Sequence, residues 1–129
     1  MLINLILNLA LGVLVGFILE FVYRSQQAKK IVWPEFINIF MYGIVGVCLV
    51  LLYYSHLNLW LELILLLIIP SLIEFLTGYI YLKFKGIYLW DYSQEFLNFR
   101  SIICMKFSLA WFVLAALYYY FIFPKIFLS

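Results

Sequence analysis

The sequence predicts an all-α membrane protein, a bundle of four transmembrane helices with a short structured loop between the third and fourth. It is too apolar for a water-soluble domain, and it contains four long apolar segments. Of its 129 residues, 69% are hydrophobic and 11% are charged, and the mean hydropathy is +1.16. A soluble domain averages about half apolar and about a quarter charged residues. We therefore expect one integral membrane domain, residues 1–129, with the lipid bilayer as its solvent.

Each apolar segment is long enough to cross the hydrocarbon core, which takes about 20 helical residues. We expect spans at about residues 2–23, 36–54, 59–82 and 101–123. No Lys or Arg precedes Arg24 and no small-residue cleavage site follows, so the first segment resembles a retained span. Pro34 suits the start of the second helix. Pro70 should weaken the third helix, and Pro124 should end the fourth.

Small and polar residues of the first span recur every four positions, which places them on one ridge of the helix. They are Asn4, Asn8, Gly12, Gly16 and Glu20. The GxxxG pair within this ridge allows another helix backbone to approach closely. In the last span, a similar series predicts a heptad-type packing seam. It comprises Ser101, Cys104, Ser108, Trp111, Ala115 and Tyr118.

The basic residues predict the orientation. The loop after the first span carries three of them, and the connection between the third and fourth spans carries Lys83, Lys85, Arg100 and Lys106. The opposite side has only Lys125. By the positive-inside rule, both loops are cytoplasmic and both termini are outside. This bias also disfavours the dual topology of small multidrug-type or fluoride-type transporters.

Glu74 is the first candidate for chemistry, because it lies roughly 13 Å along the helix axis from Lys83. An ionisable group that deep in a span is a functional hypothesis by default. The alternative, equally open, is a protonated or paired glutamate that holds helices together. Glu20 lies one turn from Arg24 and can pair with it or reach water. If the two spans pack together, the two carboxylates approach each other, and Arg100 or Lys83 could bridge them.

The loop sequence Trp90-Asp91-Tyr92-Ser93 combines turn-forming and interfacial side chains. Asp91 could pair with Arg100 or with a lysine of the loop, or it could contact a polar substrate. The aromatic residues could line the mouth of a site. We interpret Ser93 as structural. The lone His56 is expected to be solvated. Cys48 and Cys104 are expected to be packing residues rather than disulfide or metal partners.

Several function classes are disfavoured. The chain lacks the phosphate-binding GxxxxGK[ST] motif, so it cannot hydrolyse ATP by itself. It also lacks GxSxG, HExxH and CxxC, and no cofactor or metal site is expected. The basic residues sit at span ends, so no nucleic-acid partner is indicated.

The order of residues from Glu74 to Trp111 resembles the bacterial family labelled putative ABC-transporter type IV, or CmpB-like. The matching segments are E-F-L-T-G-Y and L-W-D-Y-S, followed by Asn98, Cys104, Ser108 and Trp111. The Gly-x-x-x-Glu ending at Glu20 and the Tyr42-Gly43 pair are also similar. On family-pattern positions lie Glu20, Glu74, Gly78, Trp90, Asp91, Tyr92, Ser93, Asn98 and Ser108.

The chain departs from this family in two places, and one of them is the Pro-rich entry to the second span, which is reduced here to Pro34. Members usually have Gly-Arg before Ile-Cys, where this chain has Ser101 and Ile102, with Arg100 displaced upstream. The resemblance implies an integral protein of the bacterial inner membrane with a permease role. Only the family label implies a separate ATPase partner.

The leading interpretation is a permease-like transporter component for a small polar or cationic solute, acting as a homo-oligomer or with another membrane subunit. Its expected solute site comprises Glu74, Glu20, Asp91, Tyr92, Trp90, Asn98, Arg100 and Ser108. One alternative is a non-transporting accessory or assembly subunit. A membrane-embedded enzyme using Glu74 and Asp91 as acid and base ranks last, because no nucleophile or metal set accompanies them, and we do not expect catalysis.

Overall fold

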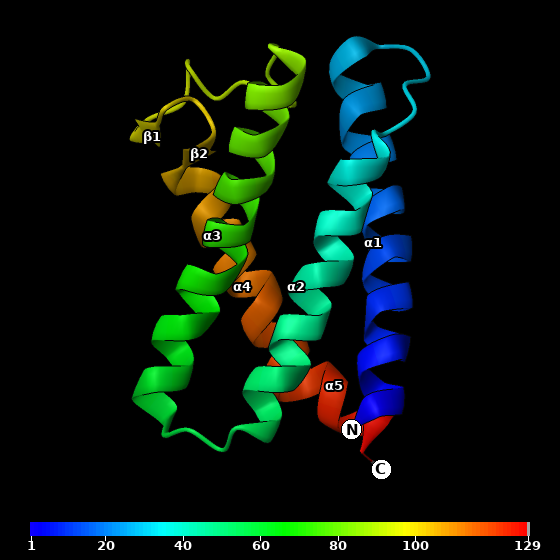
Figure 1. Ribbon diagram of the computed structural model, residues 1–129, viewed down its shortest axis with the longest axis vertical. Coiled ribbons are helices and arrows are strands. Elements are labelled where there is room, and N and C mark those ends of the chain that lie inside the picture. Colours follow the sequence, from blue (N-terminus) through cyan, green and yellow to red (C-terminus); the bar gives the residue numbers. More distant parts are fainter. Residues whose placement is uncertain (129) are drawn as a thin grey trace. The chain divides into compact units, whose positions relative to one another are not determined.

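The computed structural model describes residues 1–128 and is built almost entirely from helices (Figure 1). Four helical segments are long and apolar enough to cross a membrane. The protein is thus a multi-pass membrane protein, and its only strands among the described residues form a two-stranded sheet. The chain divides into two compact units, residues 1–51 and 52–129.

The first unit contains α1 (Leu2–Ala28) and most of α2 (Phe36–Tyr54). Helix α1 continues five residues beyond the expected end of the first span, because the polar segment after Tyr23 remains helical. It ends where Lys29 adopts a left-handed conformation with φ 57°, and the Lys29 N–H donates to the carbonyl of Ser25. The Ser25 hydroxyl then accepts from the Val32 N–H at 3.0 Å, which folds the connection back toward α2.

The two helices of this unit meet through glycines on both sides. A Cβ atom at Gly12 would lie 2.5 Å from the carbonyl oxygen of Tyr42 and 2.7 Å from the Cα of Gly43. A Cβ at Gly46 would lie 2.8 Å from the carbonyl oxygen of Asn8. Only residues without a side chain permit this separation. The predicted ridge of α1 is confirmed as a packing surface, and α2 of the same chain occupies it.

The second unit begins with the last turn of α2 and is built around α3 (Leu59–Lys85). The helix starts at Asn58, whose side chain accepts the Leu61 N–H at 3.0 Å, a typical N-cap. It runs through Pro70 without ending. Gly86 terminates it with φ 71°, a conformation that favours glycine.

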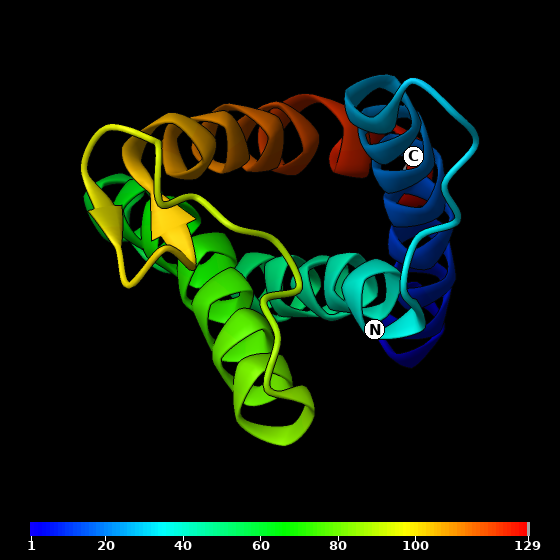
Figure 2. The same cartoon turned by 90° about the horizontal axis from the view of Figure 1, so that it is seen from above.

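A loop then leads to a small antiparallel hairpin of β1 (Asn98–Phe99) and β2 (Ile103–Cys104), in which Asn98 pairs with Cys104. Figure 2 shows this loop returning along the end of α3 to the hairpin at the start of α4. The last span therefore begins at Met105, four residues later than expected. The segment 101–104 is apolar enough to resemble a helix start, but the hairpin uses it instead.

The last span contains α4 (Met105–Leu117), the π-helix η1 (Tyr118–Ile122) and α5 (Phe123–Phe127). The expectation that Pro124 ends this span was wrong. Proline lacks an N–H and its ring clashes with the carbonyl four residues earlier in an α-helix. A wider turn before Pro124 accommodates both defects, and the proline then occupies the tolerant first turn of α5.

Candidate functional site

Glu74 is buried in the second unit, with 5% of its surface exposed. Its Oε2 atom accepts the indole N–H of Trp111 at 3.1 Å and the phenol O–H of Tyr92 at 3.4 Å. Trp111 belongs to α4 and Tyr92 to the loop, so one carboxylate joins α3 to two later segments. The hydrocarbon core of a bilayer supplies no water, so a carboxylate in a span needs protein donors such as these two.

Gly78, one turn after Glu74, determines how closely the loop approaches α3. A Cβ there would lie 2.6 Å from the side chain of Ile102 and 3.1 Å from the indole ring of Trp90. The Trp90 N–H donates to the carbonyl of Ile102 at 2.5 Å, so these two residues form one block against the glycine. The loop is thereby fixed over the part of α3 that carries Glu74.

Short-range hydrogen bonds organise the rest of the loop. Asp91 accepts the Ser93 N–H at 2.9 Å, as in an Asx turn, and the Tyr92 N–H donates to the carbonyl of Ser101 at 2.9 Å. The Asn98 amide donates to the carbonyl of Glu95 at 3.1 Å, and its oxygen accepts the Ser101 N–H at 3.1 Å. Trp90, Asp91, Tyr92 and Asn98 are thus brought into one folded loop, as their clustering in the sequence indicates.

Two predicted site residues are arranged differently. Arg100 is exposed, with φ 53°, and its guanidinium lies 5.8 Å from the centre of the Phe99 ring. The hydrogen bond that Asp91 makes is local, and an ion pair joins Glu95 of the loop to Lys106 of α4 at 4.0 Å. Ser108 is half-buried near the start of α4. The proposed pairing of Asp91 with Arg100 is therefore not formed, because the hairpin turn directs Arg100 outward.

Glu20 belongs to the first unit, where two residues hold its carboxylate. The Arg24 guanidinium donates to Oε2 at 3.2 Å, so the pairing with Arg24 is formed, one of the two alternatives that the sequence left open. The Tyr42 O–H of α2 donates to Oε1 at 2.8 Å. These contacts join α1 to α2, and an approach of Glu20 to Glu74 stays a prediction.

Buried hydroxyl and amide groups accompany these carboxylates. The hydroxyl oxygen of Ser71, three residues before Glu74 on α3, is buried and has no hydrogen-bond partner among residues 1–128. The side-chain amide of Asn38 on α2 is fully buried, and its nitrogen and oxygen likewise lack one within that range. Burying such groups without a partner is costly, so both are available to a ligand or a water molecule.

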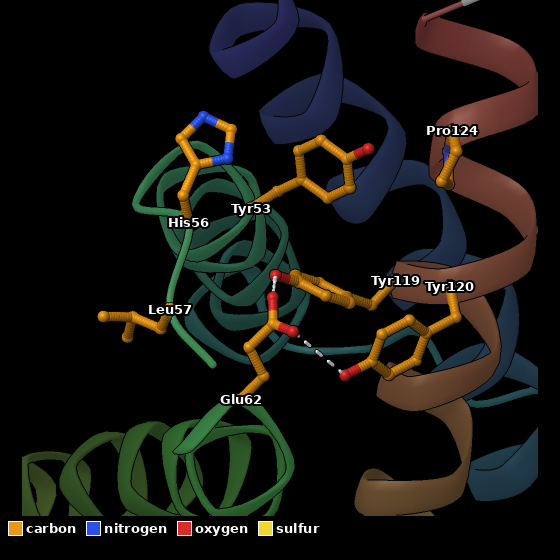
Figure 3. Close-up of a pocket in the computed structure, with 7 residues that line it drawn as sticks. All are labelled: Tyr53, His56, Leu57, Glu62, Tyr119, Tyr120 and Pro124. Atoms are coloured by element: carbon orange, nitrogen blue, oxygen red, sulfur yellow. Dashed lines mark hydrogen bonds between the residues drawn. The ribbon is translucent and has the colours of Figure 1, made fainter. Parts of the chain in front are cut away.

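Sequence reasoning missed a second carboxylate, Glu62, at the opposite end of α3. It lines a cleft of about 430 Å³ (Figure 3), together with Tyr53, His56, Leu57, Tyr119, Tyr120 and Pro124. The O–H of Tyr119 donates to Oε2 of Glu62, and the O–H of Tyr120 donates to Oε1 at 3.4 Å. The features in the sequence that belong to this cleft are the tyrosine triplet at 118–120, which ends four residues before Pro124, and the glutamate in the first turn of α3.

The cysteines behave as small packing residues. Both thiols are free, and Cys104 is 2% exposed at the start of the last span. Burial raises the pKa of the Cys104 thiol, which disfavours the reactive thiolate. No group of three or more His, Cys, Asp or Glu that could hold a metal ion occurs within residues 1–128.

Comparison with known proteins gave one finding. A family model described as "Putative ABC-transporter type IV" matches residues 7–128, nearly the whole chain. The searches of curated proteins and of solved structures found no match.

Proposed function

Because the chain belongs to the family described as "Putative ABC-transporter type IV", we propose that it is the membrane component of a transporter for a small polar or cationic solute. The observation that carries this proposal is the Glu74 carboxylate, 5% exposed within a membrane span. Ionisable residues at such positions are costly and mark solute or proton pathways.

The solute would bind at the α3 face that carries Glu74 and Ser71. A cation would replace part of the hydration that the carboxylate loses in the span, and the Ser71 hydroxyl would supply a further oxygen ligand. Tyr92 and Trp111 donate to the same oxygen of Glu74, so a bound cation would compete with those donors. Loss of the Tyr92 contact would remove one of the links between the loop and α3.

This contact provides a route from the solute to the loop. Tyr92 follows Trp90 and Asp91, so occupancy of Glu74 would alter the loop surface that a cytoplasmic partner can reach. The chain has no GxxxxGK[ST] motif, so transport driven by ATP would need a separate ATPase. Four spans barely enclose a pathway, which favours a homo-oligomer or a second membrane subunit. The inner membrane, with both termini outside, remains our proposed location.

Carbodiimide labelling can test the chemistry of Glu74. Dicyclohexylcarbodiimide reacts with protonated carboxyl groups in apolar surroundings, and peptide mass spectrometry locates the adduct. We expect an adduct at Glu74 in the purified protein and less of it when guanidinium chloride is raised to non-denaturing millimolar levels. Glu74→Gln should lose that adduct, whereas Glu95→Gln should keep it, since Glu95 lies in the polar loop.

An unreactive Glu74 in a folded protein, or an adduct that guanidinium and sodium chloride leave equally unchanged, would contradict a cation-binding carboxylate. In that case Glu74 serves as a structural link between α3, α4 and the loop. The accessory-subunit alternative would then account better for the chain.

A further inference from the structure

The cleft around Glu62 lies at the end of α3 opposite the loop, and its lining combines one carboxylate with aromatic rings. Tyr53, Tyr119 and Tyr120 are among its lining residues, and all seven lining residues belong to the second unit (Figure 3). The ring centres of Tyr119 and Tyr120 are 4.8 Å apart and their planes meet at 80°. Tyr53 and Tyr119 are 5.5 Å apart with planes at 61°.

The π-helix η1 explains why two consecutive tyrosines reach one carboxylate. Consecutive residues of an α-helix project about 100° apart, so two adjacent tyrosines of a regular α-helix would point to different sides of a carboxylate. In η1 the Phe123 N–H donates to the carbonyl of Tyr118, five residues earlier, and the turn is wider. Single π-turns within α-helices are frequently found at functional sites.

The two hydrogen-bond donors found at Glu62 within residues 1–128 are phenols, which bring no positive charge to the carboxylate. Glu62 lies in the first turn of α3, where the helix dipole stabilises a negative charge. The carboxylate therefore provides a negative potential in an open cleft that is lined in part by aromatic rings. Phenol ring faces attract cations as well, most strongly when the cation is poorly hydrated.

We infer that this cleft binds the ammonium group of an organic cation. A volume of about 430 Å³ accommodates a small alkylammonium ion with part of its substituent. The cleft adjoins the α2–α3 turn, where Tyr53, Tyr54 and Trp60 gather as aromatic residues do at a membrane surface. Both a free alkylammonium ion and the ammonium of a lipid headgroup can reach that depth. This site is separate from Glu74 and does not depend on the function proposed there.

Isothermal titration with tetramethylammonium chloride tests the inference on the protein in nanodiscs of phosphatidylglycerol, a lipid without an ammonium group. Empty nanodiscs and equal sodium chloride provide the background. We expect saturable binding with a Kd of about 1 mM. Glu62→Gln should weaken it at least about tenfold because the charge is lost, and Glu95→Gln should leave it unchanged.

Variants of Tyr120 distinguish the contribution of the aromatic ring to binding from that of the hydroxyl group. Tyr120→Phe keeps the ring and should retain binding within about threefold, whereas Tyr120→Leu removes the aromatic face and should weaken binding about tenfold. Phe121→Leu is the matched control, because Phe121 is 64% exposed one residue away. These two leucine variants keep the inference testable if Glu62→Gln does not fold.

A second arm distinguishes the sources of the ammonium group. If nanodiscs containing phosphatidylethanolamine lower the apparent affinity for tetramethylammonium, the lipid headgroup occupies the cleft; unchanged affinity identifies the free ion as the ligand. Absence of saturable binding to the wild-type protein in phosphatidylglycerol would overturn the inference. Equal binding by wild type and folded Glu62→Gln would also overturn it.

Discussion

At Gly78, α3 is in close contact with Ile102 and Trp90 of the segment that follows it. The block that faces it cannot easily move, because Ile102 is 1% exposed and Trp90 is hydrogen-bonded to the Ile102 carbonyl. A new methyl group would overlap the Ile102 side chain at 2.6 Å. Overpacking of a well-packed site typically costs about 1–3 kcal/mol.

Gly78→Ala should therefore lower the stability of the second unit by about 1–3 kcal/mol. The hydrogen-exchange rates of backbone amides in segment 89–104 should rise, because the loop can no longer pack closely on α3 at residue 78. The control is Ile80→Ala on the same helix, since Ile80 is 46% exposed and removing its side chain leaves the contact of the loop with Gly78 unchanged. Equal exchange in the two variants would show that the loop is held by other contacts.

At this scale the sequence is informative about Glu74 but not about Glu62. A carboxylate deep in an apolar segment is unusual, so Glu74 can be recognised as a candidate from the sequence alone. Glu62 lies four residues after Asn58, at a span end where a charge needs no explanation. Its importance depends on Tyr119 and Tyr120, and the π-turn that brings them there is not visible in a residue pattern.

Among the elements, α1 and α2 approach each other closely at their glycines. Gly12 faces main-chain atoms of Tyr42 and Gly43, which cannot rotate away as a side chain can. Close helix packing in a membrane relies on such small residues.

Gly12→Leu should disrupt the first unit and reduce the yield of folded protein in detergent several-fold. Leu14→Ala is the matched control, because Leu14 is 56% exposed. This substitution removes a large side chain outside the contact between the two helices. A monodisperse elution profile and helix content by circular dichroism would measure both. If Gly12→Leu were tolerated as well as Leu14→Ala, the packing of α1 on α2 described above would be incorrect.

Element boundaries were harder to predict than elements. All four spans are present, because apolar runs of about 20 residues have few other solutions in a bilayer. Helices α1 and α3 extend to Ala28 and Lys85, since polar residues continue a helix once it leaves the membrane. The hairpin before α4 was missed because its strands are two residues long and carry no alternating pattern.

For the whole molecule, the distribution of Lys and Arg predicts that both termini face outward. Single cysteines at Leu128 and Gln27, in a protein whose Cys48 and Cys104 are replaced by Ala, would report this. A membrane-impermeant maleimide added to intact cells should label the Leu128 position and not the Gln27 position. Labelling of Gln27 from outside would reverse the orientation, and with it the assignment of the loop to the cytoplasm.

Family membership covers nearly the whole chain, yet its description names a transporter type and no solute. The particular chemistry must therefore come from Glu74, which is central to this account. Glu74→Gln keeps the size of the side chain and can still accept from Trp111 and Tyr92, but it cannot ionise. Glu74→Leu removes the polar link altogether, which should loosen the contacts of the loop and α4 with α3.

The most direct measurement is whether the Glu74→Gln protein corrects the uptake or growth defect of cells that lack this protein. The folded yield in detergent is measured in parallel. We expect Glu74→Gln to fold with a yield close to wild type and to lose activity at least tenfold, because the charge itself is required. A folded and fully active Glu74→Gln protein would contradict the account. It would assign Glu74 to helix packing and leave the transported solute without a binding carboxylate in α3.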